Sequence, residues 1–87
     1  MKIGQIVKER YEILEILGEG GMAFVYKARD MQLERFVAIK TLKPNYVNQE
    51  TFVDRFKREA KTAANLNHPN IVQIFDWGIE DEPYFVM

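Results

Sequence analysis

A cluster of glycines between two strand-like runs constrains the fold of this chain most. Gly18, Gly20 and Gly21 separate the run YEILEIL, at residues 11–17, from the run AFVYKA, at residues 23–28. Both runs are rich in β-branched and aromatic residues, which favour strands, and glycines permit a tight reversal between strands. The sequence therefore predicts a hairpin. A glycine turn of this kind also occurs without any binding role, so the cluster alone does not indicate a function.

A third strand is predicted at residues 35–42. It stops at Lys43-Pro44, because proline cannot continue a paired central strand. Three strands that follow one another closely predict an antiparallel meander.

The stretch 49–67 has the period of an amphipathic helix. Its end is marked by residues 67–70, Asn-His-Pro-Asn, because proline disfavours helical geometry in the residue before it. Two more strands are predicted at residues 71–77 and 84–87, joined by a turn at 78–83. The sum is an α+β fold, a single domain over residues 1–87 with about five antiparallel strands and one principal helix on one sheet face. On a helical wheel of the stretch 49–67, one broad apolar arc contains Phe52, Phe56, Ala60, Ala63 and Ala64.

The composition excludes several classes of protein. The 87 residues have a formal charge of −1, no cysteine and one histidine, His68, so a thiolate or multi-histidine metal site and a basic nucleic-acid surface are not expected. No apolar run approaches the roughly 20 residues that span a bilayer. We expect a cytoplasmic segment without membrane contact of its own, and a membrane anchor elsewhere in a longer parent protein is compatible with this.

Lys40 and Glu59 are the candidate catalytic pair. Lys40 shares a strand face with Ala38, whereas Glu59 falls within the apolar arc of the helix, where a carboxylate needs a cation. We therefore predict an ion pair between them, a device that positions a polyphosphate when it lies in a cleft. Two alternatives stay open: an edge-strand lysine that reaches solvent, or an ion pair with a purely structural role.

The glycines do not fit a dinucleotide-binding fingerprint. That motif needs a helix after the glycines, whereas residues 23–26 continue as a strand. A hairpin tip without side chains can instead lie close over phosphates and offer its N–H groups to anionic oxygens.

Together these features resemble the N-terminal lobe of a protein kinase. The resemblance rests on the glycine-rich hairpin, the strand Val-Ala-Ile-Lys at 37–40, Glu59, the His-Pro-Asn turn and the run Tyr-Phe-Val-Met at 84–87. The segments GEGGMAFVYKARD, RFKREA and LNHPNIV resemble in particular the eukaryotic-type (Hanks-type) Ser/Thr kinases of bacteria. The similarity covers nearly the whole chain, which stops at the gatekeeper position, Met87.

The resemblance implies ATP as the cofactor, with Mg²⁺ whose protein ligands would lie on a C-terminal lobe. Lys40 would contact the α- and β-phosphates while pairing with Glu59. The adenine slot would be lined by Leu17, Val25, Ala38 and Met87. The phosphates would be covered by the loop residues Gly18, Glu19, Gly20, Gly21, Met22 and Ala23.

Two departures from the family pattern matter. Ala23 replaces the third glycine of the loop and restricts positive φ, so we expect altered loop dynamics rather than lost binding. No His-Arg-Asp loop, Asp-Phe-Gly or activation segment follows Met87, so this chain alone is not expected to transfer phosphate, although its parent would be a Ser/Thr kinase.

A rival hypothesis is a stand-alone, non-catalytic interaction module with the lobe fold. In that case apolar surface around Leu17, Val25, Ile74 and Met87 would recruit another chain or a second copy of this one. A different fold with accidental motifs is a third alternative.

Overall fold

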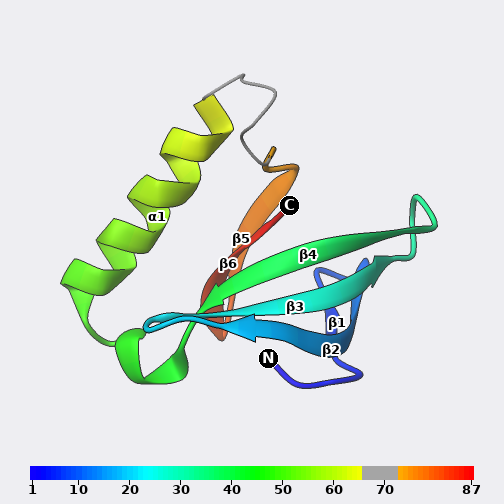
Figure 1. Cartoon of the computed structure of the whole chain (residues 1–87), viewed down its shortest axis with the longest axis horizontal. Coiled ribbons are helices and arrows are strands. Elements are labelled where there is room, and N and C mark those ends of the chain that lie inside the picture. The colour runs from blue at the N-terminus through cyan, green and yellow to red at the C-terminus, as the bar shows by residue number, and fades with distance from the viewer. Residues whose placement is uncertain (66–72) are drawn as a thin grey trace.

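The computed structural model describes residues 1–65 and 73–87, and within these it contains a six-stranded antiparallel sheet and one α-helix (Figure 1). The sheet order is β1-β2-β3-β4-β6-β5. The elements are β1 (Ile6–Val7), β2 (Tyr11–Glu19), β3 (Ala23–Asp30), β4 (Arg35–Leu42), a 3₁₀ turn η1 (Pro44–Tyr46), α1 (Glu50–Asn65), β5 (Asp76–Glu80) and β6 (Glu82–Val86).

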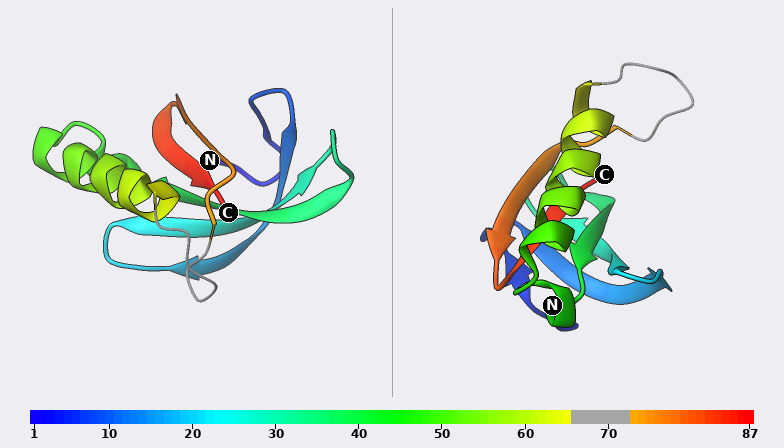
Figure 2. Two further views of the ribbon diagram at one scale, coloured as in Figure 1. Left: turned by 90° about the horizontal axis from the view of Figure 1, so that it is seen from above. Right: turned by 90° about the vertical axis from the view of Figure 1, so that its left-hand side faces the viewer.

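The predicted meander is confirmed. β3 pairs with β2 on one side and with β4 on the other, and β4 ends at Leu42, two residues before the proline that begins η1. β6 then enters between β4 and β5, with Ile39 opposite Val86. The sheet is strongly curled and α1 crosses one side of it (Figure 2).

Two apolar clusters form the core. The larger cluster lies among the strands, where Ile13, Tyr26, Ile39 and Val86 are almost fully buried. The smaller one joins the helix to the sheet: Phe56 of α1 packs on Phe85 of β6 with ring centroids 5.0 Å apart. Phe56 and Ala60 of the predicted apolar arc therefore face the sheet, together with Val53, which the predicted arc did not include.

Polar contacts connect the two ends of the curled sheet. Asp76 of β5 accepts hydrogen bonds from Lys8 Nζ at 2.6 Å and from the Tyr11 hydroxyl at 3.0 Å. Burial and the bond to Asp76 raise the pKa of Tyr11 to about 12. Burial opposes the charge of Asp76, but the hydrogen bonds from Lys8 and Tyr11 hold the pKa of its carboxyl below the usual value.

Asp30 organises the turn between β3 and β4. Its buried carboxylate accepts two bonds of 2.9 Å from the Arg10 guanidinium and bonds of 3.0 and 3.2 Å from the backbone N–H groups of Gln32 and Leu33. The bonds from Arg10 outweigh burial and lower the pKa of Asp30 well below its usual range.

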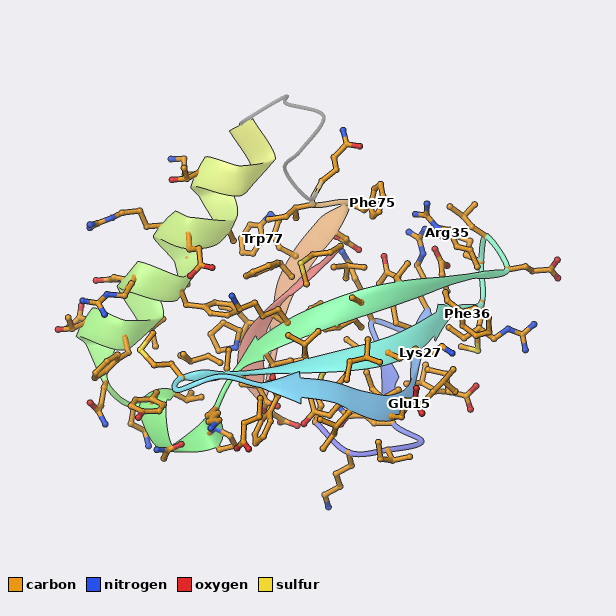
Figure 3. All side chains as sticks on the ribbon, in the orientation of Figure 1. Glu15, Lys27, Arg35, Phe36, Phe75 and Trp77 are labelled. Carbon is orange, nitrogen blue, oxygen red and sulfur yellow. The ribbon has the colours of Figure 1, made fainter. Side chains whose placement is uncertain are left out.

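Two aromatic rings on the surface lie against cations. Phe36 and Phe75 are 65% and 52% exposed, with Lys27 Nζ 4.4 Å from the first ring centroid and the Arg35 guanidinium carbon 4.5 Å from the second (Figure 3). Cations over ring faces partly shield this apolar surface.

The expected strand count and the last hairpin need correction. The described residues hold six strands rather than five, because the two-residue β1 is too short to show a period. The expected strand at 71–77 and turn at 78–83 are displaced: β5 spans 76–80, and the chain reverses at Asp81, whose φ is 65°. Residues 73–75 are not in a strand, and residues 66–72, including the His-Pro-Asn turn, lie outside the described part of the chain.

Candidate functional site

Lys40 and Glu59 are brought together as predicted. Lys40 Nζ lies 2.9 Å from Glu59 Oε1, joining the middle of β4 to α1. The side chains are 28% and 54% exposed, so Glu59 is not in the core, contrary to its expected place in the apolar arc. The sheet-facing side of α1 is centred on Val53, Phe56 and Ala60, which leaves Glu59 at the margin of that face.

The exposure of this pair keeps the lysine available for other partners. Lys40 lies opposite Val25 on β3 and Phe85 on β6, and its Nζ is 5.8 Å from the Phe85 ring centroid. An ammonium has three donors and Glu59 engages one of them at this distance. The ion pair therefore fixes the direction of the Lys40 side chain and leaves N–H donors of its ammonium available to solvent or to a bound anion.

A cleft of about 530 Å³ lies between the glycine-rich hairpin, β4 and α1. Most predicted site residues line it, and Phe56 is a lining residue that the sequence analysis had assigned only to the helix core. Helical periodicity places Phe56 on the sheet side of α1 but does not show that its ring also lines the cleft. The lining residues are Gly18, Glu19, Gly20, Gly21, Met22, Ala23, Val25, Lys40, Phe56 and Glu59.

The hairpin tip leaves space above Lys40. Gly20 N–H donates to the Ala23 carbonyl at 2.9 Å and closes the turn. A Cβ placed on Gly18 or Gly21 would meet no atom within 4 Å, so their missing side chains leave room that a bound group can occupy. A lysine and glycines without side chains line the same cleft, which fits a polyphosphate chain.

Ala23 does not have the conformation that raised concern about its replacing a glycine. It is the first residue of β3, is buried, and pairs with Leu42. It is absent from the described residues with positive φ. Since this position requires no left-handed backbone, the methyl group causes no strain here, and the reason for expecting altered loop dynamics is not present.

The three remaining predicted residues lie beside the cleft and do not line it. Ala38 is two residues from Lys40, and its backbone exchanges hydrogen bonds of 3.1 and 2.7 Å with Met87. Met87 therefore lies beside Ala38, on the side of β4 that pairs with β6. Leu17 is 55% exposed.

Among residues 1–65 and 73–87, no three His, Cys, Asp or Glu side chains are grouped so that they could hold a metal ion. In the same part of the chain, no helix combines the length and the apolar character required to cross a bilayer.

The fold and the cleft define the N-terminal lobe of a protein kinase. The sequence model of the protein kinase domain matches residues 11–87, and the chain therefore belongs to this family. The described sheet and helix agree with the predicted lobe.

Bacterial Ser/Thr kinases are among its relatives. Serine/threonine-protein kinase PrkC of Bacillus subtilis is 51% identical over 87 residues, and PknB of Mycolicibacterium smegmatis is 47% identical over 83. The matches cover 100% and 95% of this chain, but only 13% of each relative. The crystal structure of the Mycobacterium tuberculosis PknI kinase domain superimposes with a TM-score of 0.76 at 28% identity, over 100% of this chain and 35% of that one.

Proposed function

We propose that this chain forms the ATP-binding half of a Ser/Thr protein kinase that transfers the terminal phosphoryl group of ATP to protein hydroxyls. The observation that carries the proposal is the 2.9 Å contact between Lys40 and Glu59 beneath the glycine-rich hairpin. The family and the names of the relatives support it. The transfer itself belongs to the complete enzyme, because this chain has none of the catalytic or metal-binding motifs of the second lobe.

The proposed roles follow the geometry of the cleft. Lys40 would neutralise the α- and β-phosphates, and Glu59 would hold Lys40 in position from α1. The backbone of residues 18–23 would cover the phosphates. Leu17, Val25, Ala38 and Met87 would contact the adenine, and Mg²⁺ would supply charge neutralisation through ligands on the C-terminal lobe.

We expect the isolated chain to bind ATP weakly. It offers one cation and part of an apolar wall, whereas high affinity requires burial of most of the ligand. An affinity in the micromolar range or tighter would contradict this expectation.

A titration with Mg-ATP, followed by amide NMR of the labelled 87-residue chain, tests the proposal. Saturable shifts are expected at residues 18–25 and at Lys40. Lys40→Met should abolish them, whereas the matched control Lys61→Met, on an exposed part of α1 that does not line the cleft, should leave them unchanged. Wild-type spectra that are folded but unaffected by Mg-ATP would contradict the proposal.

The interaction module is the second candidate function. The exposure of Leu17 favours it, because apolar surface beside the cleft is available to a C-terminal lobe, another protein or a second copy of this chain. Sedimentation equilibrium tests self-association, and a strictly monomeric chain at high concentration would count against that form of the hypothesis.

A further inference from the structure

Lys43 contacts the glycine-rich hairpin from outside it. The residue lies between the end of β4 and η1. Its ammonium is 2.8 Å from Glu19 Oε1, and its backbone N–H donates to the carbonyl oxygen of Met22 at 2.7 Å. A single residue therefore binds both the end of β2 and the tip that leads into β3.

The strand register shows the path of this side chain. Glu19 lies opposite Phe24, and Phe24 lies opposite Thr41, so the three residues form a row across β2, β3 and β4. Lys43 follows Thr41 by two positions, and its Nζ is 5.0 Å from the centroid of the Phe24 ring. The lysine thus crosses β3 over an aromatic ring to reach β2, with only 17% of its side chain exposed.

The hairpin tip needs such an outside contact. Its glycines provide no side chains to pack, and within the tip Gly20 donates one bond to Ala23. An ion pair with an exposed carboxylate contributes little to stability by itself. Here the same lysine also makes a cation–π contact and donates a backbone hydrogen bond. Together they favour a single position of the tip over the cleft.

We propose that Lys43 is a positioning residue that holds the glycine-rich hairpin over the nucleotide cleft by binding Glu19 across Phe24. The effect of Lys43 on nucleotide binding rests on the proposed function. Its effect on the order of the hairpin tip does not. Lys43 also links the tip to α1, because it precedes η1, in which Tyr46 packs on Phe52 of α1 with ring centroids 4.8 Å apart. The element that carries Glu59 is thereby joined to the tip that covers Lys40.

Amide hydrogen exchange in the full 87-residue chain tests the order of the tip. The probes are the amides of Gly20 and of position 43, both of which donate backbone hydrogen bonds at the tip. Lys43→Met should speed exchange about five-fold, which is the effect of losing one exposed ion pair and one cation–π contact. Lys43→Arg should keep most of the protection, whereas the exchanged pair Glu19→Lys with Lys43→Glu should restore only the part that comes from the ion pair.

Lys27→Met is the matched control. It also removes a lysine that lies over an aromatic ring of the same sheet, but away from the tip, and should leave both probes unchanged (Figure 3). Unchanged exchange at the probes in Lys43→Met, or equal acceleration of every amide, would overturn the proposal. If Lys43→Met does not fold, Glu19→Gln should also speed exchange at both probes, but by less, because it removes the ion pair and leaves the cation–π contact of Lys43 in place.

Titration of the same variants with Mg-ATP separates this proposal from the proposed function. Affinity should fall about five-fold in Lys43→Met, in proportion to the loss of the ordered tip. Equal affinity in wild type and Lys43→Met would refute the role of Lys43 and leave the nucleotide site standing. The predicted exchange pattern without any response to Mg-ATP would support the role of Lys43 in ordering the tip and refute the nucleotide site.

Discussion

Gly78 on β5 lies directly opposite Tyr84 on β6, and a Cβ at position 78 would stand 2.7 Å from the tyrosine hydroxyl oxygen and 3.0 Å from its Cζ. Tyr84 is buried in the larger core cluster, so its ring cannot move aside without disturbing other side chains. Gly78→Ala should therefore destabilise the fold by about 1–3 kcal/mol, as overpacking does in other cores. Urea unfolding measures this change.

The controls for this prediction come from the same chain. Gly21→Ala adds the same methyl group where no atom lies within 4 Å, and should change the free energy of unfolding by less than about 1 kcal/mol. Tyr84→Phe in the Gly78→Ala background removes the nearest clashing atom and should recover part of the loss. Equal stabilities of Gly78→Ala and Gly21→Ala would show that the ring yields freely.

Acid should destabilise the fold through Asp30. Its pKa is lowered in the folded state by the hydrogen bonds from Arg10, so this contribution to stability is present above the ordinary carboxyl pKa, about 4, and is lost as the pH falls below it. Asp30→Asn should lower the free energy of unfolding by about 2–3 kcal/mol at neutral pH and make this free energy depend less steeply on pH in the acid range. Urea midpoints across the acid range test both points; an equally steep limb in the variant would contradict them.

Alkali should destabilise the fold through Tyr11. Its pKa is raised to about 12, so folding favours the protonated phenol. Its contribution is present below the ordinary tyrosine pKa of about 10 and is lost as the pH rises towards 12. Tyr11→Phe should remove this loss of stability in alkali. It should also lower the free energy of unfolding by about 1 kcal/mol at neutral pH, because the hydrogen bond to Asp76 is lost. Phenolate absorbance with parallel unfolding curves tests the assignment, and a Tyr11 that titrates normally would refute it.

The turn between β1 and β2 should be improved by glycine. Lys8 and Glu9 have φ of 56° and 55°, and Arg10 N–H donates to the Val7 carbonyl at 3.0 Å. This closes a β-turn whose two left-handed central positions are usually occupied by asparagine or glycine in other proteins. Glu9→Gly should raise stability by about 0.5–1 kcal/mol because it removes the left-handed strain. Glu12→Gly, the same change inside β2, should lower stability, and a loss in both variants would show that Glu9 is unstrained.

The sequence predicted the central strands because their signals are local. Residues 11–42 alternate in character, contain glycines at the hairpin and end at a proline, so the meander needed no knowledge of distant parts. The last hairpin was displaced because Gly78 and Pro83 have the composition of a turn. In the structure Gly78 is small to accommodate Tyr84, and Pro83 lies beyond the last pair of β4 and β6, Thr41 with Tyr84. The roles of these two residues depend on how β4, β5 and β6 pair, which the local sequence does not show.

At the candidate site, the pairing of Lys40 with Glu59 was predictable, whereas its exposure was not. A carboxylate on a largely apolar wheel suggested a nearby cation, but the wheel does not show that the sheet meets α1 on the side of Val53 and Ala60. The contact of Lys43 with Glu19 was not predicted either. It joins β2 to the residue that follows β4, and because β2 and β4 are not neighbours in the sheet, no periodic pattern relates residues at such positions.

The place of β6 in the sheet has a consequence for synthesis. β6 fills the position beside β4, yet it leaves the ribosome only after α1 and β5. While α1 and β5 are being translated, the backbone groups of Ala38 and Lys40, which face β6 in the finished sheet, have no strand to pair with, and an open edge is a template for wrong partners. We therefore expect this lobe to be most exposed to aggregation between completion of the meander and emergence of β6, and we expect the speed of translation over that interval to affect the yield of folded protein.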